Sequence, residues 1–108
     1  MYQFKELYTI DFSNVKYYME IHPIIQKALD FPDYYGCNLA ALWDCLTDMV
    51  GRPIHIEIIG LEVLERSFGD YGERLVDTFR DLKHYDNDAY AHEIQMEIVS
   101  GDTRVSLH

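Results

Sequence analysis

The sequence predicts an α/β fold in which a small three-stranded parallel sheet packs against about four helices. Three short, β-favouring apolar stretches are separated each time by two segments whose apolar residues recur every three or four positions. Helical connections between successive strands favour parallel pairing with right-handed crossovers. The chain has 108 residues, of which 48% are hydrophobic and 14% aromatic, which is enough for one domain with one modest core.

The N-terminal part of the chain is expected to form a strand and then a helix. Residues 4–12 are a short β-favouring stretch and predict a strand that ends near Asp11. The helix contains Pro23 in its first turn, where the missing N–H of proline costs no hydrogen bond, and it ends before Pro32. Its apolar face consists of Ile21, Ile24, Ile25, Ala28 and Leu29, which share the spacing of one helical stripe.

A loop over residues 31–38 leads into a second helix. Asn38 is a favourable N-cap, so the helix is expected to run from about Leu39 to Met49, with Gly51 placed to end it. The buried stripe of this helix is expected to contain Leu39, Leu42, Leu46 and Met49 or Val50.

The second half of the chain is expected to hold two strands and two helices. Pro53 precedes a buried strand, IHIEII, and residues 61–67 form a short helix that ends at a Gly69–Gly72 break. Residues 93–99 alternate as a third strand, and residues 100–108 form a tail outside the core region 6–99 that could turn into a short fourth edge strand. A longer helix lies between the Gly69–Gly72 break and the third strand. One face of it contains Tyr71, Leu75, Phe79 and Leu82.

The charge of the chain limits its partners. Nine Lys and Arg residues against 19 Asp and Glu residues give a net charge of −10, which argues against direct binding to nucleic acid or to an anionic membrane surface. The first 54 residues carry 4 basic and 7 acidic side chains (net −3), and the last 54 carry 5 and 12 (net −7). This charge fits a basic protein partner, and a merely solvated acidic surface would explain it as well.

The remaining composition points to a cytoplasmic protein without a cofactor. Cys37 and Cys45 fit a reducing compartment, where both are expected to be free thiols, and no signal peptide or membrane-spanning apolar run is apparent. The five histidines lack metal-ligand spacing, and no glycine-rich nucleotide-binding motif occurs, so neither a metal nor a cofactor is expected.

Aromatic and acidic residues gather at the junction between the loop and the second helix. Tyr34 and Tyr35 precede Trp43 and Asp44, a combination of aromatic anchors and a charge that is typical of protein–protein hot spots. The same aromatic residues could instead pack the loop and the helix onto the core. Both interpretations remain open from these residues alone.

An enzymatic function has less support. Asp44 with Asp48, or the acidic residues 73, 77 and 81, could in principle serve acid–base chemistry, but acidic residues four apart on an amphipathic helix usually form its solvated face. No nucleophile, base and orienting group are recognisable, and a pair of Cys37 with His22 has no sequence support. We therefore expect a binding protein and not an enzyme.

Residues 31–47, FPDYYGCNLAALWDCLT, resemble the signature of the barstar family, roughly P-x-Y-Y-G-x-N-L-[DA]-A-L-W-D-x-L. Members of this family are intracellular inhibitors of small secreted bacterial ribonucleases such as barnase. The resemblance implies a barstar-like single domain over residues 1–108. It also implies that the loop and the second helix cover the active site of a ribonuclease.

The resemblance assigns roles to individual residues. Asp44 would take the place of the RNA phosphate among the arginines and the catalytic histidine of the ribonuclease, and Tyr34 would cover the active site. Asp81, on the last helix, would be a peripheral partner for a basic residue. The remaining residues of the implied partner-binding surface are Tyr35, Gly36, Asn38, Leu39, Ala40, Trp43 and Thr47.

Three positions differ from the best-known member of the family. Ala40 and Cys37 stand where acidic residues occur, and Met49 replaces an aromatic residue. These changes leave a second interpretation open, in which the protein is an immunity protein or antitoxin retargeted to a different basic toxin or nucleic-acid enzyme.

Overall fold

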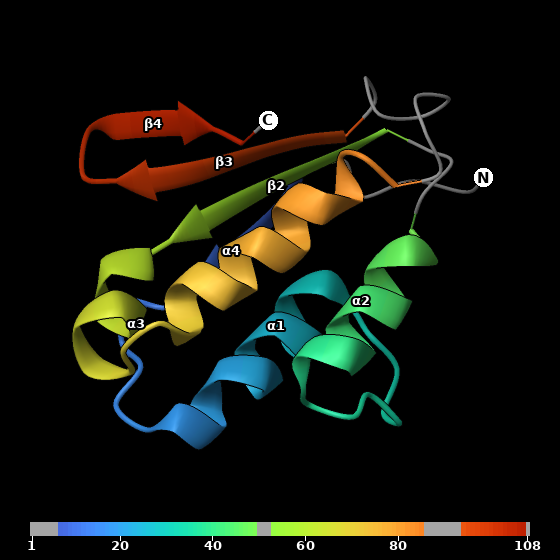
Figure 1. Ribbon diagram of the computed structural model, residues 1–108, viewed down its shortest axis with the longest axis horizontal. Coiled ribbons are helices and arrows are strands. Elements are labelled where there is room, and N and C mark those ends of the chain that lie inside the picture. The colour runs from blue at the N-terminus through green and yellow to red at the C-terminus, as the bar shows by residue number, and fades with distance from the viewer. Residues whose placement is uncertain (1–6, 50–52, 86–93, 108) are drawn as a thin grey trace.

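The computed structural model describes residues 7–49, 53–85 and 94–107. The predicted alternation of strands and helix pairs is confirmed, with a short 3-10 helix (η1) added before the first α-helix (Figure 1). In chain order the elements are β1 (Leu7–Asp11), η1 (Tyr18–Glu20), α1 (Ile21–Leu29), α2 (Leu39–Thr47), β2 (Ile54–Ile59), α3 (Leu61–Ser67), α4 (Tyr71–Leu82), β3 (Ile94–Ser100) and β4 (Thr103–Ser106).

The sheet contains the three predicted strands and a fourth, which is the short edge strand that residues 100–108 could form. Its order is β1-β2-β3-β4, in which the first two pairs are parallel as expected and β4 pairs antiparallel with β3. Gly101, with φ of 59°, allows the tight reversal between β3 and β4. The backbone N–H of Leu107 then donates to the carbonyl of Met96 at 2.9 Å, and the Leu107 side chain is only 3% exposed. Thr103–Ser106 therefore belong to the sheet, and Leu107 belongs to its core.

The helices cover one face of the sheet. In Figure 1, α1, α2 and α4 lie together on the same side of the strands. The side chains of β1 and β2 alternate between buried and at least partly exposed positions, as expected for a sheet packed on one face only. The buried positions of the sheet, including Ile10, Ile56 and Met96, point toward this helical layer.

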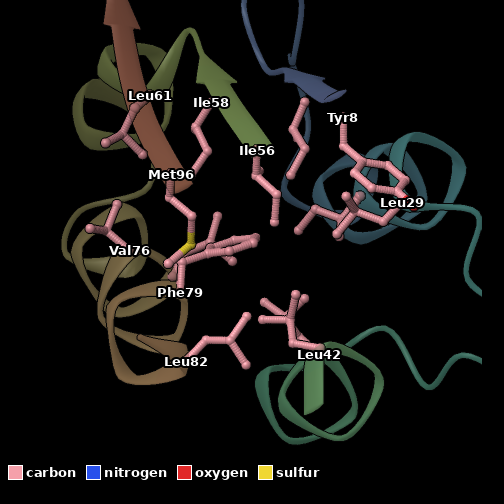
Figure 2. Close-up of a cluster of buried hydrophobic side chains, with 14 of the residues drawn as sticks. Tyr8, Leu29, Leu42, Ile56, Ile58, Leu61, Val76, Phe79, Leu82 and Met96 are labelled. Carbon is pink, nitrogen blue, oxygen red and sulfur yellow. The ribbon is translucent and has the colours of Figure 1, made fainter. Parts of the chain in front are cut away.

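The core joins all the layers into one cluster. Figure 2 shows Leu42 of α2 opposite Leu82 of α4, with Phe79 and Met96 between α4 and the sheet. Phe79 and Leu42 have no exposed surface. The cluster also fixes α2 against α4, and these are the two helices that carry the residues implied by the family resemblance.

One predicted boundary is wrong. The second helix ends at Thr47 and not at Met49, because the Met49 N–H bonds to the carbonyl of Leu46, three residues back, and so leaves the α-helical pattern. Met49 is nonetheless buried as expected, together with Leu42 and Leu46. Val50 and Gly51 lie outside the described residues.

A charged network covers part of the open face of the sheet. Glu57 of β2 and Glu97 of β3 are register neighbours, and like charges at such positions repel. Arg104 of β4 bonds to both carboxylates, and this contact holds the pKa of Glu57 below its ordinary value. His55 Nε2 lies 2.6 Å from Glu97 Oε1. β4 thus contributes a cation that bridges the two carboxylates of the central strands and reduces their repulsion.

The connection between β2 and α3 requires a glycine. Gly60 has φ of 78°, and a Cβ at this position would lie 2.4 Å from the backbone nitrogen of Ser13. The chain after β1 and the start of α3 therefore approach each other more closely than any side chain would allow.

We expect Gly60→Ala to lower the free energy of unfolding by about 3 kcal/mol or more, since the added methyl collides with backbone as well as requiring a left-handed conformation. Gly101→Ala is the matched control, because its φ is also positive but no atom lies within 4 Å of the added Cβ. Its loss should be about 1–2 kcal/mol, for backbone strain alone. Urea unfolding of both variants measures the difference, and equal losses would contradict the steric explanation.

Candidate partner-binding site

The loop between α1 and α2 is held at its start by α1. Asp30 adopts a left-handed conformation with φ of 57° and ends α1. The side-chain amide of Gln26 then donates to the carbonyl of Pro32 at 2.8 Å, and the Tyr35 N–H bonds to the same oxygen at 3.0 Å. The loop therefore begins in a defined turn against α1.

The two neighbouring tyrosines of the loop point in opposite directions. Tyr34 is 83% exposed, whereas Tyr35 is 6% exposed and packs against Phe31 with 5.2 Å between ring centroids. Core packing therefore applies to Tyr35, and only Tyr34 has the exposure that partner binding requires. Tyr35 belongs to the core, and Tyr34 is available to a partner.

Tyr35 is anchored by a buried histidine. His22 of α1 is 4% exposed, and its Nδ1 lies 2.6 Å from the Tyr35 hydroxyl. Its Nε2 lies 2.5 Å from the hydroxyl of Tyr71 on α4. A neutral imidazole has one donor and one acceptor nitrogen, so it can satisfy both hydroxyls at once. The loop is thereby connected to both α1 and α4.

Burial sets the protonation state of this cluster. Removal from water disfavours charged forms, so burial lowers the pKa of His22 and raises the pKa values of Tyr35 and Tyr71. All three groups are therefore neutral near pH 7. His22 has both ring nitrogens engaged by tyrosines, and it is thus not oriented as a base toward Cys37.

The second part of the loop leads directly into α2. The Asn38 side chain accepts a hydrogen bond from the N–H of Ala41 at 2.7 Å, which confirms the expected N-cap. Gly36 lies close under the helix, since a Cβ there would be 3.2 Å from that of Ala41. Cys37 adopts φ of 56°, a conformation unusual for a residue with a side chain, and is exposed.

α2 has one face that is buried in the core and an opposite face that is exposed and carries an acidic residue. Ala40 and Asp44 are exposed, one turn apart, on the side away from the core. Thr47 donates its hydroxyl to the backbone carbonyl of Asp44 at 2.9 Å, which fixes this side chain against its own helix. Leu39 is half-buried at the start of the helix. The exposed face therefore presents a small residue beside a carboxylate.

Trp43 connects this surface to the end of α4. It is half-buried, and its ring meets that of Tyr85 edge to face, with centroids 5.5 Å apart. Asp81 lies exposed on α4, one helical turn before Tyr85. The packing of Trp43 on Tyr85 therefore brings the C-terminal end of α4, with Asp81, beside α2.

The sequence did not indicate that His22 and Tyr71 support the loop. His22 lies within the apolar stripe of α1, and Tyr71 was assigned only to the apolar face of α4. A lone histidine in an apolar stripe was the available signal, but its two partners lie 13 and 49 residues away in sequence.

Within residues 7–49, 53–85 and 94–107, no group of three or more His, Cys, Asp and Glu side chains is arranged to hold a metal ion. No helix in these same ranges combines the length and apolar character needed to cross a membrane. Cys37 and Cys45 are both free thiols.

Comparison with known proteins identifies the family of this chain. The family model described as "Barstar (barnase inhibitor)" matches residues 6–98. A Bacillus subtilis (strain 168) protein named "Putative ribonuclease inhibitor YrdF" is 36% identical over 73 residues, which cover 68% of this chain and 77% of that protein.

The chain belongs to the barstar family. The resemblance inferred from residues 31–47 is confirmed, and so is the α/β fold that it implied. The family is one of ribonuclease inhibitors, which places this protein in a class that acts by binding an enzyme. β4 lies beyond the residues that the family model matches.

The opposite orientations of the two tyrosines lead to a stability prediction. Tyr35→Phe removes the hydroxyl that bonds to His22 and leaves a buried ring nitrogen unsatisfied, so the free energy of unfolding should fall by about 1–3 kcal/mol. Tyr34→Phe removes an exposed hydroxyl and should change it by less than about 0.5 kcal/mol. Chemical denaturation of the two variants tests this, and a smaller effect at Tyr35 than at Tyr34 would refute the anchoring role.

The neutral state of His22 should make stability decline at low pH. In the unfolded chain the imidazole binds a proton near its ordinary pKa of about 6.5, whereas the lowered pKa in the folded protein resists protonation. The contribution of His22 to stability is therefore complete above about pH 6.5 and is lost as the pH falls toward the lowered pKa, with a slope of at most about 1.4 kcal/mol per pH unit. Urea unfolding between about pH 8 and about pH 5.5 measures this slope. His22→Gln, which does not titrate, should flatten it, and an unchanged slope would assign the effect to other groups.

Proposed function

We propose that this protein inhibits a small basic bacterial ribonuclease by covering its active site with residues 31–38 and the exposed face of α2. One observation carries the proposal. The loop is anchored from within by Tyr35, while Tyr34 and Asp44 project from the same loop–helix unit toward solvent. A rigid loop with an exposed aromatic residue and an exposed carboxylate forms a preorganised binding surface, which limits the entropy lost on association.

Asp44 is the proposed mimic of the RNA phosphate. Within the described residues its carboxylate takes part in no hydrogen bond or ion pair, so it is free to accept bonds from a partner. A carboxylate can accept paired N–H bonds from an arginine, and exclusion of water at the interface strengthens them. Tyr34, Gly36, Asn38, Leu39, Ala40, Trp43 and Thr47 would surround this contact, Tyr35 would position the loop, and Asp81 would bind a basic residue at the periphery.

The overall charge supports such a partner. A ribonuclease binds a polyanion and therefore has a basic active site, and a net charge of −10 on this chain would accelerate association through long-range attraction. In this proposal the protein acts in the cytoplasm, has no catalytic activity of its own and binds neither nucleic acid nor a membrane. Its partner is a small ribonuclease of the type that bacteria secrete, or a related basic toxin.

A second candidate function rests on Ala40 and Cys37. Both are exposed, and neither carries the negative charge that the best-known member of the family has at that position. A partner with fewer arginines at the corresponding positions would fit such a surface better than barnase does. In this alternative the protein is an immunity protein or antitoxin against a different basic toxin or nucleic-acid enzyme.

Titration of this protein into a barnase-like ribonuclease distinguishes the two functions. RNA cleavage is followed at low and at near-physiological salt. Stoichiometric inhibition that weakens as salt rises is the expected result, because screening reduces attraction between the exposed charges. No inhibition at either salt concentration would contradict the proposed target and favour the retargeted function.

Asp44→Ala should weaken binding to that ribonuclease by about 30- to 1,000-fold, equivalent to about 2–4 kcal/mol, because the partner's cations would be left buried without a counter-charge. Asp70→Ala is the matched control. It removes the same charge from an exposed position before α4, where the Asp70 side chain makes no capping hydrogen bond. Its effect should be less than about fivefold, since it changes only long-range attraction. Equal losses for the two variants would exclude the phosphate-mimic role.

A further inference from the structure

A second surface of the molecule combines an apolar floor with an acidic rim. It is a groove of about 260 Å³ between α3, α4 and the end of β3, which we call the α3–α4 groove. Leu61 and Val76 are buried in its floor beside the half-buried Ile98. Figure 1 shows α3 against the N-terminal half of α4, on the side of α4 away from α2.

Gly72 allows the two helices to form this groove. It is buried on α4, and a Cβ there would lie 3.3 Å from Cγ of Glu65 and 3.4 Å from Cβ of Leu64. The stem of Glu65 therefore rests against α4, and Glu65 lines the edge of the groove.

The rim of the α3–α4 groove has an excess of negative charge. Glu65, Glu73 and Asp77 line it together with one cation, Arg80. Arg80 is already engaged, because its guanidinium donates to Asp77 at 2.7 Å. In the described portions of the chain, Glu65 and Glu73 have no hydrogen-bond or ion-pair partner. Two exposed carboxylates thus remain uncompensated beside an apolar floor.

The size and chemistry of the groove select its occupant. Sites for small organic ligands usually enclose about 300–1,000 Å³ within mostly apolar walls, whereas this groove is smaller and its rim is charged. An arginine or lysine side chain fits both parts. Its aliphatic stem can cover Leu61 and Val76 while its charged end stays among the carboxylates.

We propose that the α3–α4 groove is a second docking site, which receives an arginine or lysine side chain from the basic protein partner. The identity of this partner rests on the proposed function, but the chemistry of the groove does not. The groove is continuous with the candidate partner-binding site through α4, because Asp77 on its rim and Asp81 in that site are one helical turn apart. A partner that covers α2 and Asp81 needs to extend by only one helix width to reach the groove.

The first test needs no ribonuclease. Methyl groups of the intact protein are followed by NMR while Nα-acetyl-arginine-N-methylamide is added. We expect saturable shifts at Leu61, Val76 and Ile98 with a millimolar dissociation constant, and their loss in the double variant Glu65→Gln/Glu73→Gln. The control variant Glu62→Gln/Asp70→Asn also removes two negative charges, but from nearby residues that do not line the groove. It should bind the arginine derivative like the parent. Absent shifts, or equal losses in the two variants, would overturn the proposal.

The second test uses a barnase-like ribonuclease. Glu65→Gln/Glu73→Gln should speed dissociation of the complex about tenfold, whereas the control pair should slow only association, because lost long-range attraction acts on encounter. If the parent binds the arginine derivative in the groove but does not bind the ribonuclease, the proposed target fails and the docking site stands. If the ribonuclease binds and both pairs dissociate alike, the groove is not part of the interface.

Discussion

The hydrogen bonds of a buried neutral histidine connect the parts on which the proposed activity depends. His22 on α1 joins Tyr35 of the loop to Tyr71 of α4, so three separate segments meet at one ring. Each hydroxyl would be costly to bury without a partner, and the imidazole satisfies both. Burial lowers the pKa of His22 and keeps its ring uncharged, so the protonation state of the group that anchors the loop depends on the packing of the core around it.

The anchored loop shows how one short segment could serve both stability and the proposed binding. Tyr35 contributes its ring to the core, and this leaves Tyr34 directed outward by the backbone itself. Asn38 then begins α2 at a fixed point, which sets the direction of Asp44 from the capped end of the helix. Exposed residues on such a support need little ordering on association, so less entropy would be lost on binding than with an acidic surface of flexible side chains.

Much of the fold was predictable because its signals are local. Apolar spacing identified α1, α2 and α4, and the alternation around Ile56 and Met96 identified two strands, since these patterns repeat over a few residues. The end of α2 was placed two residues too far along, because helix ends depend on individual hydrogen bonds such as that of Met49 to Leu46. The surface residues of the family motif were also recognisable, because they lie within one continuous segment.

The sequence by itself determined the order of the elements, the family and the excess of acidic charge, all of which depend on neighbouring residues or on composition. Only the tertiary structure decided that β4 pairs with β3 and that Arg104 lies between Glu57 and Glu97. Only the tertiary structure places His22 between its two tyrosines and forms the α3–α4 groove. These features join residues distant in sequence, and their contacts arise only when the core brings the segments together.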